Sequence, residues 1–127
     1  MIGYVTVGTN DPERANAFYA ALLSEIGAKL VFGDGHYSFY GIDMQSPLLA
    51  VCRPYNGAPH VVGNGAMVAF QMPDRATVDR LHARALELGG SDEGEPGLRE
   101  PPEMQFYGAY FRDPEGNKLC VFRMGAA

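Results

Sequence analysis

The chain has 127 residues, a net charge of −5 at pH 7 and a hydrophobic share of 46%. This length fits one domain with a sizeable core, and the hydrophobic share argues against disorder. The shortage of Lys and Arg excludes sequence-independent binding of nucleic acid, because phosphate charges would stay unneutralised.

The start of the chain and its cysteines indicate a cellular location. Met1 is followed by neither a charged n-region nor an apolar h-region, so we expect no secretory signal. The apolar runs are too short to span a membrane, so no membrane partner is expected. Cys52 and Cys120 do not make a disulfide framework and fit reduced thiols. These features predict a cytoplasmic protein.

The first half of the chain begins with a β-branched strand at Gly3–Val7. A helix is predicted next, because Asp11 is a good N-cap and Pro12 fits the first helical position. Apolar residues recur at helical spacing over residues 15–26, and Gly27 supplies a stop. Three strands are predicted after this helix: Lys29–Phe32, His36–Tyr40 and Leu48–Cys52.

The second half repeats this order. A strand is predicted at Ala66–Gln71, Asp74 is the N-cap of a second amphipathic helix, and Gly89 and Gly90 end it. The strands that follow are a weak segment after Gly90, then Phe106–Arg112 and Lys118–Arg123. The last two are joined by the turn "DPEGN". Its proline fixes φ and its glycine tolerates positive φ, as tight turns require.

Two tandem βαβββ modules are the simplest account of this repeat. Even the closing strands match, since residues 49–53 read LAVCR and residues 119–123 read LCVFR. We therefore predict an α+β fold in which two modules form a curved sheet around a cleft. The single domain would span residues 1–127, with module 1 at about 1–56 and module 2 at about 65–127. The linker, at about 57–64, lies in the Gly- and Pro-rich stretch Pro54–Gly65.

Several segments resemble one known family in order and spacing. They are "DPERANAFYAALL" in the first helix, "GNGAMVAFQMPDRATVDRLHARALELGG" at the start of the second module, and "YGAYFRDPEGNKLCVF" in the closing hairpin. Over essentially the whole chain, this pattern resembles the vicinal oxygen chelate superfamily, which includes glyoxalase I, bleomycin-resistance proteins and extradiol dioxygenases. The resemblance implies a cleft that in family enzymes holds a divalent metal ion.

The resemblance also implies which positions would bind that metal. Tyr4 and Met67 fall where the family often has histidine, Cys120 replaces the closing glutamate, and Ala50 is its counterpart in the first module. A phenol ionises near pH 10, a thioether is a soft neutral donor, and one thiolate alone does not make a catalytic zinc set. We therefore expect no metal cofactor, although these four residues would still line the ligand cleft.

The sequence gives little support for a replacement metal site or for an activated nucleophile. The three histidines, His36, His60 and His82, are scattered along the sequence, although His36 or Cys120 could contribute to a replacement site. Cys120 would act as a nucleophile only as a thiolate with a neighbouring base or cation. No spacing supports that arrangement, and the sequence identifies no catalytic residue.

Strand alternation predicts further residues of the cleft wall. Thr6, Ala69 and Phe122 would point the same way as the metal positions, and Arg99 would lie near the cleft mouth or be a solvated loop charge. Aromatic walls would come from Tyr107 or its neighbour Phe106, together with Tyr37 or Tyr40. The alternative is that these side chains simply pack into the core.

The predicted function is metal-free binding of a small apolar or aromatic molecule, in the manner of the bleomycin-resistance proteins. The first alternative is a metal-dependent lyase or dioxygenase of the glyoxalase class with noncanonical ligands. The second is a metal-free enzyme that uses tyrosine or cysteine. Proteins of this kind commonly dimerise, so a homodimer is expected.

Overall fold

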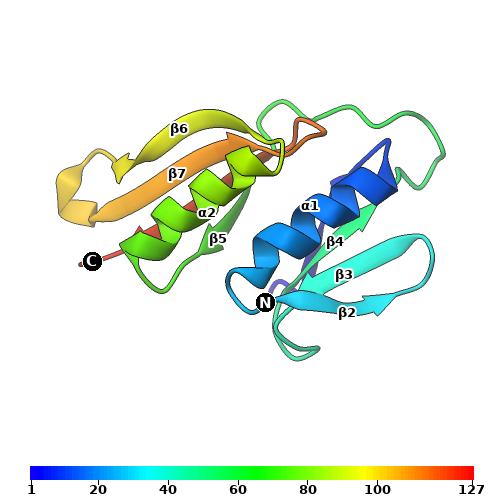
Figure 1. Cartoon of the computed structure of the whole chain (residues 1–127), viewed down its shortest axis with the longest axis horizontal. Coiled ribbons are helices and arrows are strands. Elements are labelled where there is room, and N and C mark those ends of the chain that lie inside the picture. The colour runs from blue at the N-terminus through cyan, green and yellow to red at the C-terminus, as the bar shows by residue number, and fades with distance from the viewer. The chain divides into compact units, whose positions relative to one another are not determined.

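The computed structural model describes all 127 residues and divides them into two compact units, Met1–Asn64 and Gly65–Ala127, called module 1 and module 2 below. Each module contains one helix and one four-stranded sheet (Figure 1). The predicted α+β class with two βαβββ modules is therefore confirmed. No helix of the chain is both long and apolar enough to cross a membrane.

Module 1 follows the predicted order of elements closely. These elements are β1 (Tyr4–Gly8), α1 (Pro12–Ser24), β2 (Lys29–Gly33), β3 (Tyr37–Gly41) and β4 (Leu48–Cys52). The strands lie in the order β1-β4-β3-β2, with β1 and β4 parallel and the other pairs antiparallel. Helix α1 begins where predicted, because the Asp11 carboxylate accepts a hydrogen bond from the Arg14 N–H at 3.1 Å.

Module 2 repeats the same topology. Its elements are β5 (Val68–Gln71), α2 (Arg75–Glu87), β6 (Ser91–Leu98), the short 3₁₀ helix η1 (Pro102–Met104), β7 (Phe106–Arg112) and β8 (Lys118–Met124). The strand order is β5-β8-β7-β6, again with one parallel pair, β5 and β8. The Asp74 carboxylate caps α2 by accepting from the Thr77 N–H at 2.7 Å.

The register of the parallel pairs shows how the two modules correspond. Val5 pairs with Leu49 in module 1, and Val68 pairs with Leu119 in module 2. Positions of β1 therefore correspond to positions of β5, and positions of β4 correspond to positions of β8. Thr6 is equivalent to Ala69, and Ala50 to Cys120, while Tyr4 corresponds to Met67, the residue before β5.

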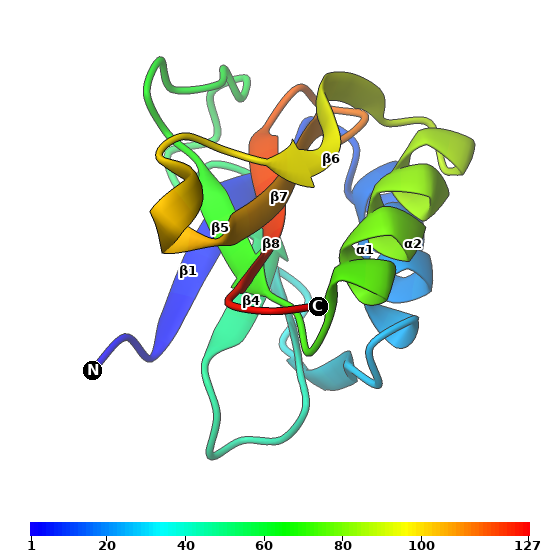
Figure 2. The same cartoon turned by 90° about the vertical axis from the view of Figure 1, so that its left-hand side faces the viewer.

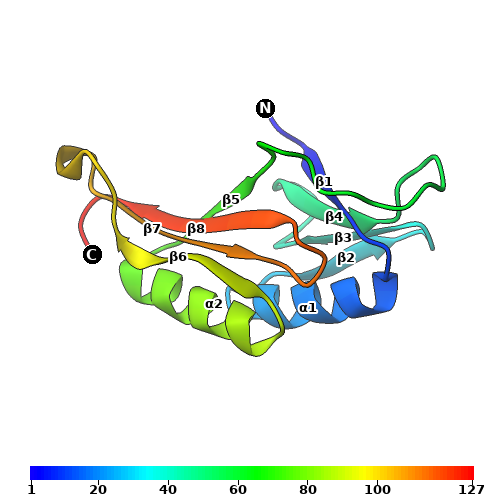
Figure 3. The same ribbon diagram turned by 90° about the horizontal axis from the view of Figure 1, so that it is seen from above.

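Within each module, the helix covers one face of the sheet and leaves the other without a helix (Figures 2 and 3). The covered faces form the cores, because apolar helix residues pack there against alternate strand residues. In module 1 the buried residues include Val7, Phe18, Tyr19, Leu22, Leu49 and Val51. In module 2 they include Val78, Leu81, Ala85, Ala109, Phe111, Leu119 and Val121.

Strand β6 is longer than the weak segment that its sequence indicates. Its residues, SDEGEPGL, are poor strand formers, yet they pair with β7 at the edge of the sheet. An edge strand tolerates Pro96, because that residue has no N–H to donate to a ladder. The pairing is irregular between Asp92 and Gly94 and again between Gly94 and Gly97, which marks two bulges.

Candidate functional site

Each module has one sheet face that carries no helix, and each of these faces is a candidate site. Alternation along the paired strands assigns side chains to these helix-free faces. For module 1 they are Tyr4, Thr6, Phe32, Tyr37, Phe39, Ala50 and Cys52. For module 2 they are Ala69, Phe106, Gly108, Tyr110, Lys118, Cys120 and Phe122.

The helix-free face of module 1 is aromatic. The ring of Phe39 lies 5.3 Å from that of Tyr4, edge to face, and 5.8 Å from that of Phe32. Tyr37 adds a third contact with Phe39, at 5.7 Å. Tyr4 is 56% exposed and Phe32 is 49% exposed, so two large rings of this cluster remain accessible to solvent. An accessible aromatic cluster of this kind can contact a planar apolar molecule, with ring faces and ring edges both available.

The helix-free face of module 2 combines aromatic rings with positive charge. Phe106 and Phe122 stack with ring centroids 5.0 Å apart, and Gly108 leaves room for the Phe106 ring beside it. The next residue along this face of β7 is Tyr110. The guanidinium carbon of Arg99 lies 5.3 Å from the centre of the Tyr110 ring, and the ammonium nitrogen of Lys118 lies 5.5 Å from it.

Of the four metal positions that the family resemblance implies, Tyr4, Ala50 and Cys120 lie on the helix-free sides of the two sheets, and Met67 immediately precedes β5. Ala50 and Cys120 are fully buried, whereas Tyr4 and Met67 are exposed. Tyr4 offers a phenol, Met67 a thioether and Cys120 a thiol, and Ala50 has no donor atom. This set does not fit a divalent ion that prefers imidazole and carboxylate ligands. In neither module do three or more His, Cys, Asp or Glu side chains lie together as a metal site would require.

Cys120 is not placed as an activated nucleophile. Burial raises the pKa of its thiol, and a hydrogen bond from the Tyr110 hydroxyl and the charges of Arg99 and Lys118 act in the opposite direction. Burial also raises the pKa of the Cys52 thiol. Both sulfurs therefore favour the neutral thiol, the less reactive form.

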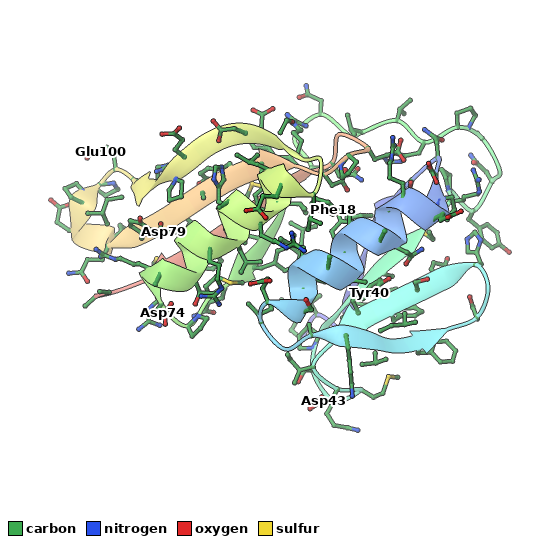
Figure 4. All side chains as sticks on the ribbon, viewed as in Figure 1. Phe18, Tyr40, Asp43, Asp74, Asp79 and Glu100 are labelled. Atoms are coloured by element: carbon green, nitrogen blue, oxygen red, sulfur yellow. The ribbon has the colours of Figure 1, made fainter.

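Two of the aromatic candidates lie on the helix-covered faces instead. The Tyr107 hydroxyl donates to the Asp79 carboxylate of α2 at 2.6 Å, so Tyr107 is not a residue of the helix-free face and its neighbour Phe106 is. Similarly, the Tyr40 hydroxyl donates to the Asn16 side chain of α1 at 2.6 Å (Tyr40 and Asp79 are labelled in Figure 4). The physical reason is strand alternation, which turns adjacent residues to opposite faces.

Each of the three histidines has its own contacts in the structure. His60 packs against Gly8, where any side chain would collide with the imidazole, and its backbone N–H and carbonyl both bond to the Asn10 side chain. His82 is buried on α2, and its Nε2 lies 2.9 Å from the Asp92 carboxylate. His36 is exposed and lies edge-to-face against Tyr37, so it contributes to no cluster of metal ligands.

The comparisons with known proteins agree with this geometry. The family model "Glyoxalase/Bleomycin resistance protein/Dioxygenase superfamily" matches residues 1–121. A solved structure of a glyoxalase/bleomycin resistance protein from Albidiferax ferrireducens T118 is 34% identical, with a TM-score of 0.88. That match covers 97% of this chain and 98% of the other.

More distant structures share the fold alone. A glyoxalase-related enzyme from Fulvimarina pelagi is 21% identical with a TM-score of 0.75, over 97% of this chain and 87% of the other. A lactoylglutathione lyase from Agrobacterium tumefaciens is 24% identical with a TM-score of 0.68, over 97% and 92%. No protein with a curated description matches the chain.

Proposed function

This chain belongs to the glyoxalase/bleomycin resistance protein/dioxygenase superfamily, and from that membership we propose that it binds a small apolar or aromatic molecule without a metal ion. The observation that carries the proposal is the aromatic cluster on the helix-free face of module 1. Folded proteins usually bury large rings, so a connected cluster with two accessible rings favours a ligand surface.

The chemistry of the metal positions supports the metal-free part of the proposal. Tyr4 offers a phenol and Met67 a soft thioether, and Ala50 has no donor atom. The remaining group, the Cys120 thiol, is fully buried and has a raised pKa, so a thiolate ligand is disfavoured. A metal ion would have to displace the Tyr110 hydrogen bond and deprotonate this sulfur.

The alternative function is a metal-dependent lyase or dioxygenase with noncanonical ligands. The family name favours it, because that family includes enzymes of both classes. The two candidates differ in a direct measurement. Metal analysis of the purified protein should find less than 0.1 equivalent of any divalent ion under metal-free binding, whereas the enzyme requires about one equivalent that survives desalting.

The binding function is tested with a planar probe. Isothermal titration calorimetry with 2-naphthamide should detect binding, and the Tyr4→Ala variant should weaken it roughly two- to tenfold, since one aromatic contact is lost. Leu86→Ala is the matched control, because Leu86 is an exposed apolar residue of α2 and should leave the affinity unchanged. Equal losses in both variants would count against a specific surface on module 1.

A homodimer remains part of this proposal, because closed twofold assemblies are the commonest among soluble proteins. Light scattering at micromolar concentration tests it. A mass near 13.8 kDa would contradict the dimer, and twice that mass would support it.

A further inference from the structure

We propose that the helix-free face of module 2 contains a subsite for a carboxylate, held by Arg99 and Lys118 beside the ring of Tyr110. The ligand class would then be a small aromatic carboxylate rather than a neutral apolar molecule. This inference deepens the proposed function and rests on it.

The two cations lack carboxylate partners. Arg99 and Lys118 both face the Tyr110 ring, and no acidic side chain forms an ion pair with either. Arg112, on the same side of β7, has its charge compensated, because its Nε donates to Glu93 at 2.7 Å. In a chain with a net charge of −5, two cations beside one ring without an acidic partner favour an anion there.

Arg99 is held in place by the backbone of β6. One terminal nitrogen, Nη1, donates to the carbonyl of Gly97 at 2.9 Å, and the other, Nη2, donates to the carbonyl of Glu95 at 2.8 Å. A guanidinium has five N–H donors, so three remain for a ligand. Because the side chain is already fixed, binding an anion costs little additional conformational entropy.

Strand β6 leaves space for the Arg99 side chain. A Cβ at Gly94 would lie 3.0 Å from the Tyr110 ring and 3.3 Å from Arg99, and one at Gly97 would lie 3.2 Å from Arg99. The two bulges of β6 occur at these same glycines. Bulges and glycines weaken a strand, and they are common where a side chain is redirected toward a site.

The aromatic stack of Phe106 and Phe122 lies close to the Tyr110 position on the same face of the sheet. Along this face of the sheet, Phe122 lies opposite Gly108 and Cys120 lies opposite Tyr110. The stacked rings of Phe106 and Phe122 are therefore two residues away from the Tyr110 position, which is about 7 Å along a strand. This spacing suits a molecule whose ring contacts the stack while its carboxylate reaches Arg99 and Lys118.

The test compares two probes of the same shape, 2-naphthoate and 2-naphthamide, by isothermal titration calorimetry of the full chain. The charged probe should bind about tenfold more tightly, since a charge-assisted hydrogen bond is stronger than a neutral one. Arg99→Gln and Lys118→Gln should each reduce this preference several-fold and leave the amide affinity unchanged. Lys29→Gln is the matched control, because it removes an exposed lysine from β2 of module 1.

A second measurement separates failure of the subsite from failure of the proposed function. Sodium sulfate at constant ionic strength should shift the Nε–H nuclear magnetic resonance of Arg99, whether or not any aromatic probe binds. Equal affinities for the two naphthalenes, with no sulfate shift, would overturn the carboxylate subsite and leave aromatic binding intact. A sulfate shift without binding of either naphthalene would support the anion site and contradict the aromatic-binding function. Arg99→Lys keeps the charge and should retain part of the preference if Arg99→Gln is poorly folded.

Discussion

The substitution Gly94→Ala tests most sharply whether β6 is shaped around Arg99. The added methyl group would lie 3.0 Å from the edge of the Tyr110 ring and 3.3 Å from Nη2 of Arg99. Both distances are shorter than ordinary van der Waals contact, so one neighbour must move. The Arg99 nitrogen is fixed by the Glu95 carbonyl at 2.8 Å, and moving it weakens that hydrogen bond.

The expected magnitude follows from two opposing terms. Replacing glycine by alanine stabilises by about 0.4–1 kcal/mol through the unfolded state where the backbone is compatible. Inserting a methyl group into a packed position costs about 1–3 kcal/mol. Gly94→Ala should therefore lower the free energy of unfolding by about 1–2 kcal/mol. It should also lower the affinity for 2-naphthoate several-fold, because the guanidinium is displaced.

Urea denaturation followed by circular dichroism measures the stability term, with two matched variants. Gly97→Ala meets only Nη1 of Arg99, at 3.2 Å, and should have a smaller effect. Gly3→Ala meets no atom within 4 Å and should be neutral or slightly stabilising. If Gly94→Ala were as stable as Gly3→Ala and bound 2-naphthoate as well as the wild type, the account of β6 would be wrong.

Three further predictions concern stability and reactivity. Asp11→Ala should lower the free energy of unfolding by about 1 kcal/mol in urea titrations, because it removes the N-cap of α1. The pKa of Asp92 lies below its ordinary value, because the carboxylate accepts from the Gly94 N–H and from His82. The stability from this carboxylate is present above pH 4 and is lost as the pH falls through the lowered pKa, so the deficit of Asp92→Asn should disappear on acidification. Cys120 is fully buried, and its thiol should react with an aromatic disulfide reagent at pH 7 only after urea is added.

The sequence predicted the elements of the fold because their signals are local. Caps such as Asp11 and Asp74 and the 3.6-residue apolar spacing determine the helices within a few residues. The matching closing strands predicted the repeat, and the register of β4 and β8 agrees with it. The sequence indicated strand β6 only weakly, because glycine and proline are poor strand formers. In the structure its glycines lie at the two bulges and leave space for Arg99.

The site was less predictable because its arrangement depends on contacts distant in sequence. Alternation alone left Tyr107 and Phe106 as equal candidates, and the helix contact with Asp79 decided between them. A signal for this choice was present, since Ala109 and Phe111 share the face of Tyr107 and resemble core residues. The packing of His60 against Gly8 had no comparable local signal, because the two residues are separated by most of module 1.

The central claim is that this member of the superfamily binds its ligand without a metal ion. The most direct measurement is isothermal titration calorimetry of protein dialysed against EDTA, using 2-naphthoate with and without one equivalent of Zn²⁺ or Ni²⁺. We predict the same affinity in every case and no heat from the metal alone. Binding that appears only after metal is added would contradict the claim and favour the metal-dependent enzyme.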